Sequence, residues 1–266
     1  MKKLAITLLA ALTLPLAAAH ALTGLEVAKK ASLASYYAGD DGSAQMLMKV
    51  YAKNSKKPIK KMFTMLKKDV TEGGEQLFFT YFTQPSDIKR TTFLVKKKIK
   101  GDDFRRLYMP ASDKVLAISG ARKQDPFMGS DFSYEDVSGR HFSKDKHKLL
   151  GTESSKGVKV HVIESTPKVK EEKIAKIKSW IDAKSFIPQK VEFIGHDGKV
   201  FKIFTAEKVQ KIEGIPTIMK QVMVSPIEGT RTEILVNPKK VHYNLGLATS
   251  LFSERSLRNP PMKYLK

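Results

Sequence analysis

The residues that could carry out chemistry in this chain are few, and their spacing does not build a recognisable catalytic or metal site. The sequence has six histidines and no cysteine. No two histidines are spaced as in His-x-x-x-His or His-Glu-x-x-His, the patterns that place two zinc ligands on one face of a helix. The chain also lacks a Gly-x-Ser-x-Gly turn, a phosphate-binding glycine loop and a thiol nucleophile. We therefore expect no catalytic residue, no metal and no cofactor.

Three carboxylates close together in sequence are the remaining candidates for catalysis. Asp131, Glu135 and Asp136 could include an acid–base pair, which needs no fixed spacing in the sequence. Acidic residues in the first turn of a helix are, however, stabilised by the helix dipole, and we favour that interpretation. The alternative is a hydrolase of an envelope lipid or polymer, whose turnover would be lost when Asp131 or Asp136 is changed to Asn.

The segment that carries these carboxylates, residues 120–140, is predicted to be irregular with a short helix. Pro126 and Gly129 interrupt any preceding strand. Ser130 is a good N-cap for one or two helical turns, and Gly139 is placed to end them. We call residues 120–140 the lid, for the reason given next.

The lid is unusually apolar for a loop. Four large apolar side chains fall within eight of its residues, and they are Phe127, Met128, Phe132 and Tyr134. Since a solvated loop rarely carries so many large apolar groups, this segment is expected to cover another apolar surface.

Residues 127–136, Phe-Met-Gly-Ser-Asp-Phe-Ser-Tyr-Glu-Asp, resemble a motif of the outer-membrane lipoprotein-sorting protein family. These are the LolA-like carriers of the bacterial periplasm, and the resemblance is to the larger branch of the family. Residues 180–199, with Trp180-Ile181-Asp182 and the Asp197-Gly198 turn, resemble the central hairpin of the same carriers. The resemblance implies one strongly curved antiparallel sheet whose concave apolar face is closed by short helices and accepts lipid chains.

The N-terminal residues 1–21 are interpreted as a signal peptide. Lys2 and Lys3 precede an apolar run at residues 4–16, and Ala19-His20-Ala21 places small residues at both positions of a cleavage site. The mature protein is then a single domain of residues 22–266 in the periplasm. Because there is no cysteine, we expect neither a disulfide nor a lipid anchor.

The chain is strongly basic. Its formal charge is +21, and removal of Lys2 and Lys3 leaves +19 (21 minus 2). Such a field attracts polyanions, but export makes nucleic acid an unlikely partner and favours an anionic membrane surface. The simpler explanation is that lysines occupy exposed strand ends and edges, where they prevent strand pairing between chains. Lysine runs occur at residues 56–57, 60–61, 67–68 and 96–98.

The regular elements predict a mainly β fold. A helix is expected over residues 23–37, where Thr23 and Glu26 form a capping box. A further short helix is expected over residues 251–257. Between them, strands are predicted at residues 45–53, 59–70, 75–83, 91–98, 103–109, 114–119, 148–153, 157–165, 174–182, 187–196, 199–209, 216–225 and 229–236. Such a meander indicates a curved antiparallel sheet or a barrel. The resemblance to the carriers implies the first of these, a single curved sheet that forms an incomplete barrel closed by short helices.

The strand periodicity predicts which side chains line the concave face. The candidates for ligand binding are Met46, Met48, Val50, Phe79, Arg106, Val191 and Phe193. Arg106 is chosen over Arg105 because it shares a strand face with Phe104 and Tyr108. The strand at residues 75–83 is apolar on both faces, so we expect it to be covered on both sides although its register stays open.

The expected function is that of a periplasmic carrier, which binds a lipid or the acyl chains of a lipoprotein and shuttles it across the envelope as a monomer. The resemblance implies an inner-membrane exporter as donor and an outer-membrane acceptor. A second possibility is a protein that senses an envelope lipid or signals through a membrane partner without transferring lipid.

Overall fold

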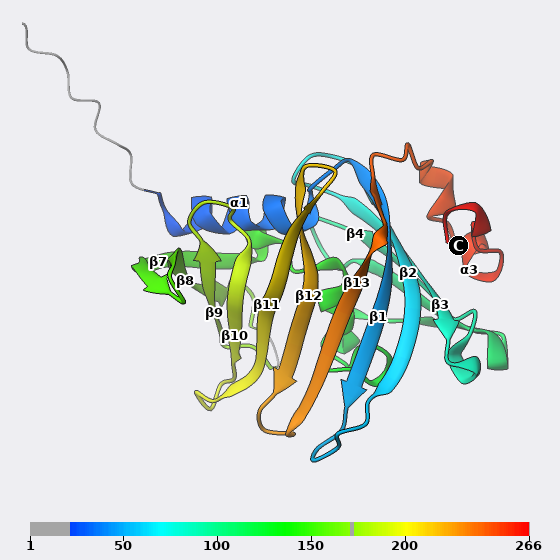
Figure 1. Ribbon diagram of the computed structural model, residues 1–266, viewed down its shortest axis with the longest axis horizontal. Helices are drawn as coiled ribbons and strands as arrows, with labels where there is room; N and C mark the ends of the chain where they lie inside the picture. Colours follow the sequence, from blue (N-terminus) through cyan, green and yellow to red (C-terminus); the bar gives the residue numbers. More distant parts are fainter. Residues whose placement is uncertain (1–21, 171–172, 266) are drawn as a thin grey trace, which may run out of the picture.

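The computed structural model describes residues 22–170 and 173–265, so the predicted signal peptide lies outside the described residues. The described chain forms one antiparallel sheet and short helices (Figure 1). The strands are β1 (Asp41–Tyr51), β2 (Ile59–Asp69), β3 (Gln76–Gln84), β4 (Thr92–Lys97), β5 (Phe104–Met109), β6 (Lys114–Ala117), β7 (Asp145–Ser155), β8 (Val158–Pro167), β9 (Lys176–Asp182), β10 (Pro188–Ile194), β11 (Val200–Ile212), β12 (Ile215–Ser225) and β13 (Thr230–Tyr243). The α-helices are α1 (Gly24–Tyr36), α2 (Tyr134–Ser138) and α3 (Glu254–Arg258).

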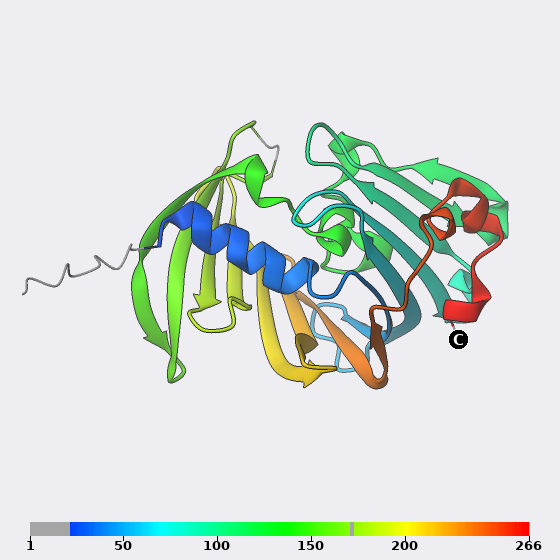
Figure 2. The same ribbon diagram turned by 90° about the horizontal axis from the view of Figure 1, so that it is seen from above.

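The order of strands leaves the sheet open. The order is β6-β5-β4-β3-β2-β1-β13-β12-β11-β10-β9-β8-β7, and each neighbouring pair is antiparallel. The consecutive strands β6 and β7 therefore lie at opposite edges. The chain that joins them, which contains the lid, passes across the concave side (Figure 2). The predicted incomplete barrel closed by short helices is confirmed.

Helix α1 lies across the half of the concave face that ends at β7 (Figure 2). Its N-terminus forms the predicted capping box, since Glu26 N donates to Thr23 Oγ1 at 3.2 Å and Thr23 N donates to Glu26 Oε2 at 2.7 Å. The helix buries a stripe of Val27, Ala28 and Ala31 against apolar residues that include Ile163 of β8 and Ile181 of β9. Burial of this stripe stabilises a helix that is too short to persist alone.

The other half of the concave face is packed against the lid. On β3, alternation directs Phe78 and Phe82 to this side, where they join a cluster with the lid residues Phe127, Phe132 and Tyr134. The rings of Phe82 and Phe127 lie 5.9 Å apart between centroids, and those of Phe127 and Tyr134 lie 5.5 Å apart. Aromatic packing therefore attaches the lid to one half of the sheet.

The convex face of the same strands is covered by residues 244–265, which we call the C-terminal segment (Figure 1). Apolar residues of this segment are buried against Leu66, Leu77, Phe79, Tyr81 and Leu94, and they are Leu247, Phe252, Leu257 and Leu265. Thr92 Oγ1 donates to Leu257 O at 2.8 Å, so a polar contact adds to the apolar ones. Strand β3 is thus covered on both sides, as its apolar character predicted.

Several elements differ from their predicted bounds by a few residues, and two of them are described here. Strand β13 continues to Tyr243 rather than ending at residue 236, because its pairing with β1 resumes at Val241 opposite Ala44 after a bulge at residues 237–240 of β13. Asn237 Nδ2 donates to Gln45 Oε1 at 3.0 Å beside this bulge. The final helix is shorter than predicted and consists of α3 alone, preceded by a 3-10 turn at Thr249–Leu251.

Within residues 22–170 and 173–265, no helix combines the length and the apolar character that a membrane crossing requires.

The C-terminal segment should contribute substantially to stability. Phe252 is 1% exposed, so Phe252→Ala is expected to lower the free energy of unfolding by about 3–5 kcal/mol through lost burial and the resulting cavity. Urea unfolding followed by circular dichroism measures this change. Met262→Ala, in the same segment but 37% exposed, is the control and should change it by no more than about 0.5 kcal/mol. Equal effects of the two variants would contradict a packing role for the segment.

Candidate functional site

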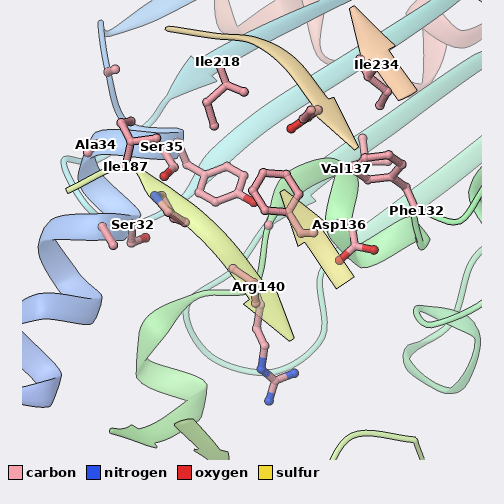
Figure 3. A pocket seen from close by; sticks show the side chains of 18 of the residues that line it. Ser32, Ala34, Ser35, Phe132, Asp136, Val137, Arg140, Ile187, Ile218 and Ile234 are labelled. Carbon is pink, nitrogen blue, oxygen red and sulfur yellow. The ribbon is translucent and has the colours of Figure 1, made fainter. Parts of the chain in front are cut away.

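A cavity of about 410 Å³ lies between the concave face, helix α1 and the lid (Figure 3). Its volume falls within the range of natural small-molecule sites. The sheet contributes mainly apolar side chains to its wall, among them Met46, Met48, Phe63, Met65, Phe78, Phe204, Met223 and Ile234. The concave face is therefore not filled by the protein's own side chains, and the space beneath the lid suits an apolar ligand.

The residues predicted for the site fall into three groups. Those that line the cavity are Met46, Met48, Val191, Phe193, Phe127 and Phe132. Val50, Met128 and Tyr134 pack against or within the concave apolar cluster beside the cavity. Phe79 and Arg106 form the third group and lie elsewhere.

The prediction that Phe79 and Arg106 face the cavity is wrong. Phe79 is fully buried in the cluster beneath the C-terminal segment, on the convex side of β3. The Arg106 guanidinium lies 3.9 Å from the centre of the Phe104 ring, and its Nε lies 3.9 Å from Glu254 of α3. Apolar neighbours on the same strand face do not show that Phe79 or Arg106 is on the concave side. The convex face of these strands is apolar as well, because it packs against the C-terminal segment.

Arg105 is the arginine that points to the concave side. It pairs across the sheet with Val95, which belongs to the concave cluster, and only 1% of Arg105 is exposed. Its guanidinium forms a buried ion pair with Asp103. Alternation along β5 would have predicted Arg105 for the concave face if the C-terminal segment had been expected to cover the convex face.

A tight turn within the lid precedes α2. Met128 has φ 51° and Gly129 has φ 70°, so the chain reverses at these two residues. The predicted cap Ser130 does not begin the helix, because its Oγ donates to Phe127 O at 2.7 Å within the turn. The helix begins after Ser133, whose side chain forms a capping box with Asp136.

Asp131 fastens the lid to the β12–β13 hairpin. Its carboxylate accepts hydrogen bonds from three hydroxyls, Ser225 Oγ at 2.6 Å, Thr232 Oγ1 at 2.6 Å and Thr230 Oγ1. The Asp131 N–H also donates to Thr232 Oγ1 at 3.0 Å. Because Asp131 precedes α2, the helix dipole does not explain this residue, and the predicted dipole role is wrong for it.

Asp136 makes a second attachment to the sheet. Lys202 Nζ of β11 lies 2.7 Å from Asp136 Oδ2, and both side chains are largely buried. On the other side of the lid, Lys61 Nζ of β2 donates to Met128 O. The lid is therefore held by polar contacts from β2, β11 and the β12–β13 hairpin.

Glu135 connects the lid to β7. It is 2% exposed and accepts from Arg140 Nη1 at 3.4 Å, while Lys123 Nζ lies 3.8 Å from its other oxygen. Arg140 also donates from Nη2 to Asp145 of β7 at 2.8 Å. Each of the carboxylates considered for catalysis therefore has a partner that stabilises the lid.

Two lysines lie on the concave side rather than in solvent, so the prediction for the lysine runs is wrong for these two residues. Lys97 Nζ donates to Ser138 O at the end of α2 at 2.8 Å, and burial lowers the Lys97 pKa to about 8. Lys67 Nζ donates to Tyr36 O at 2.8 Å, and burial also lowers its pKa. Burial, and then the negative charges of Asp136 and Glu135, raise the pKa of Tyr36.

Histidine and acidic side chains do not assemble into a metal site in the part of the chain that the structure describes. The His147 ring has a structural role, since its Nδ1 lies 2.7 Å from Ser165 Oγ and its Nε2 lies 2.7 Å from Phe142 O. These contacts fix the ring at the cavity wall between β7 and β8.

Comparison with known proteins establishes the class. A family model, described as that of an uncharacterized protein, matches residues 74–259. A solved outer membrane lipoprotein-sorting protein domain from Vibrio parahaemolyticus is 30% identical, with a TM-score of 0.80 over 88% of this chain and 98% of that one. The chain belongs to the outer-membrane lipoprotein-sorting protein family.

Two more distant structures support the fold. A DUF1329 family protein from Desulfovibrio piger is 24% identical, with a TM-score of 0.81 over 88% of this chain and 97% of that one. A LolA superfamily protein from Nitrosomonas europaea is 17% identical, with a TM-score of 0.70 over 88% and 99% of the respective chains. The search of curated proteins found no match.

The buried Lys97 should make stability depend on pH. Between its folded pKa of about 8 and its ordinary value of 10.5, the unfolded chain binds a proton that the folded chain does not. The free energy of unfolding should therefore rise with pH in this window, by at most about 1.4 kcal/mol per pH unit. Urea titrations at pH 7.5, 8.5 and 9.5 measure the slope.

Lys97→Met should flatten that slope, whereas Lys98→Met, at an exposed neighbouring position, should preserve it. Lys67 adds to the rise in the wild type, and Tyr36 opposes it only near and above pH 10, where an unfolded tyrosine ionises. An unchanged slope in Lys97→Met would show that this lysine does not titrate in the window.

Proposed function

We propose that this protein is a periplasmic carrier that binds a lipid, or the acyl chains of a lipoprotein, and shuttles it across the envelope. The observation that carries the proposal is the apolar cavity of about 410 Å³ between the concave sheet and the lid. Membership of the lipoprotein-sorting family supports the same role. The proposal includes export to the periplasm, with residues 1–21 acting as a cleaved signal peptide.

The cavity wall suits alkyl chains of varied length and shape. Methionines from three strands line it, namely Met46, Met48, Met65 and Met223. Their unbranched thioether side chains adopt many conformations at similar energy, so the wall can repack around different chains. No covalent step or cofactor is needed for this task.

The expected affinity fits a carrier. Burying ten methylene groups contributes about 8 kcal/mol at about 0.8 kcal/mol each, from which the cost of association is subtracted. The result is a dissociation constant near or weaker than micromolar. Such binding retains the lipid during diffusion and still permits its release to an acceptor.

The lid must separate from the sheet when the lipid enters or leaves. Its attachments through Asp131 and Asp136 consist of hydrogen bonds and one ion pair, which water can replace. Its apolar contacts through Phe127 and Phe132 are made with the same wall that would hold alkyl chains. A bound chain could therefore replace the lid's contacts with the wall while the polar attachments open and close.

The partners that we propose are an inner-membrane exporter as donor and an outer-membrane acceptor, each meeting the carrier as a monomer. A protein that only senses lipid would bind a partner in its loaded form and would not deliver lipid. Transfer of labelled lipid from loaded protein to acceptor vesicles therefore separates the two roles.

An anionic membrane is a further proposed partner. The β1–β2 turn carries exposed Lys53, Lys56 and Lys57, and it adjoins the β12–β13 turn, where Gly229 lies against Lys53 and Ile227 is 59% exposed. Both turns lie at the lower end of the sheet in Figure 1. Cations around an exposed apolar side chain suit a surface of anionic head groups.

The lid's role can be tested through Phe132. Phe132→Asp places a charge in the concave apolar cluster, so the lid should lift and the bound lipid should be lost while the strand signal in circular dichroism persists. Mass spectrometry of an organic extract of the purified protein, expressed with its signal peptide, measures the lipid that it carries.

Val169→Asp, at a residue that is 76% exposed, introduces the same charge away from the lid and should leave the lipid in place. A wild-type extract without lipid, or a Phe132→Asp protein that retains its full lipid content, would count against the carrier proposal or the lid's part in it, respectively.

The membrane surface can be tested by charge reversal. Lys56→Glu combined with Lys57→Glu should weaken binding to phosphatidylglycerol vesicles by several-fold or more at low salt, since each lysine near such a surface contributes about 1 kcal/mol. Vesicle co-sedimentation measures the binding. Lys208→Glu combined with Lys211→Glu makes the same change near the opposite end of the sheet and should have a smaller effect. Equal losses in both variants would indicate a response to net charge alone.

A further inference from the structure

A glutamine lies among the apolar residues of the sheet's concave wall. Gln221 of β12 lines the cavity and pairs with Ile234 of β13 and Ala206 of β11. Cross-strand partners point to the same face of a sheet, and Ile234 lies at the cavity wall (Figure 3). Met223, two positions further along β12, belongs with Ile234 to the concave apolar cluster. Gln221 therefore faces the cavity with hydrocarbon around it.

The amide group of Gln221 is open to the cavity and has no partner in the described part of the chain. No residue there donates to its Oε1 or accepts from its Nε2, and neither atom is sealed beneath neighbouring side chains, since Gln221 is only half-buried. Gln124, the other glutamine at the cavity, differs, because its Nε2 donates to Glu135 Oε2 at 2.5 Å. An amide that faces an apolar wall is costly to leave unpaired. Its partner therefore comes from whatever occupies the cavity.

The charges around the cavity indicate that this partner is uncharged. Although the chain as a whole carries +21, the lysine and arginine side chains that line the cavity are Lys67 and Arg140, against the carboxylates of Glu135, Asp136 and Asp145. Both cations are engaged, since Lys67 Nζ donates to a backbone carbonyl of α1 at 2.8 Å and Arg140 Nη2 donates to Asp145 at 2.8 Å. A phosphate or carboxylate at this wall would therefore lack a charge partner.

We propose that Gln221 determines which ligands the cavity accepts, by hydrogen bonding to an uncharged polar group at the end of an alkyl chain. The inference rests on the carrier function and specifies its ligand class. A group that both donates and accepts, such as an amide, satisfies Gln221 Oε1 and Nε2, whereas an ester only accepts and leaves Oε1 without a donor. A site with such polar groups discriminates against ligands that leave them unpaired. The apolar wall supplies most of the affinity, and Gln221 supplies the selectivity.

Two synthetic ligands isolate the hydrogen-bond donor. Dodecanamide and methyl dodecanoate share the alkyl chain and a carbonyl oxygen, but only the amide has N–H donors. Displacement of a pyrene-labelled alkane from delipidated protein measures the dissociation constant of each. The ratio of the two constants should favour the amide about tenfold more in the wild type than in Gln221→Met. Methionine keeps the unbranched shape of the side chain and removes its amide.

Gln210→Met is the matched control. It makes the same substitution at an exposed residue of β11 that does not line the cavity, so it should keep the wild-type ratio. The empty Gln221→Met protein should be as stable in urea as the wild type, because the amide that it loses has no partner among the described residues. A marked fall in its stability would assign Gln221 a structural role and overturn the inference.

The outcomes separate the inference from the function on which it rests. If neither ligand displaces the labelled alkane, or if the labelled alkane itself does not bind, the carrier function fails. If both ligands bind but Gln221→Met keeps the wild-type ratio, or if Gln210→Met changes the ratio as much, the role of Gln221 is excluded and the carrier function stands.

Discussion

The structure depends on one constraint of connectivity. Strands β6 and β7 follow each other in sequence but occupy opposite edges of the sheet, because β1 pairs with β13 in its middle. The chain between them has to cross the open concave side, and an apolar segment on that path becomes a cover. The lid is therefore a consequence of the strand order, and the space beneath it is bounded by the curvature of the sheet and by α1.

The lid is attached to the sheet by contacts of two kinds, which lie at different places. Aromatic packing of Phe127 and Tyr134 holds the lid over one half of the sheet, where β3 receives a second cover from the C-terminal segment. The hydroxyls around Asp131 and the ion pair of Asp136 hold it near the other half, beside the cavity. The lid is thus held mainly by apolar packing over one half of the sheet and mainly by polar contacts near the other.

The same arrangement places unusual polar groups next to hydrocarbon. Lys97 is buried at the end of α2, and the hydroxyl oxygens of Ser32 and Ser35 are buried in α1 without a hydrogen-bond partner among the described residues. Such groups lower the stability of the empty protein.

Local chemistry and periodicity in the sequence determined the elements. The Thr23–Glu26 capping box, the alternating strands and the apolar residues 127–134 depend on near neighbours, so the meander and the existence of a lid could be predicted. The open form of the sheet was predicted from the family resemblance. Only the tertiary structure decided which face of each strand is concave. The C-terminal segment makes the convex face equally apolar, and this reverses the places expected for Phe79 and Arg106. It also decided that Asp131 meets hydroxyls about a hundred residues away, because contacts at such separation leave no periodic trace in a single sequence.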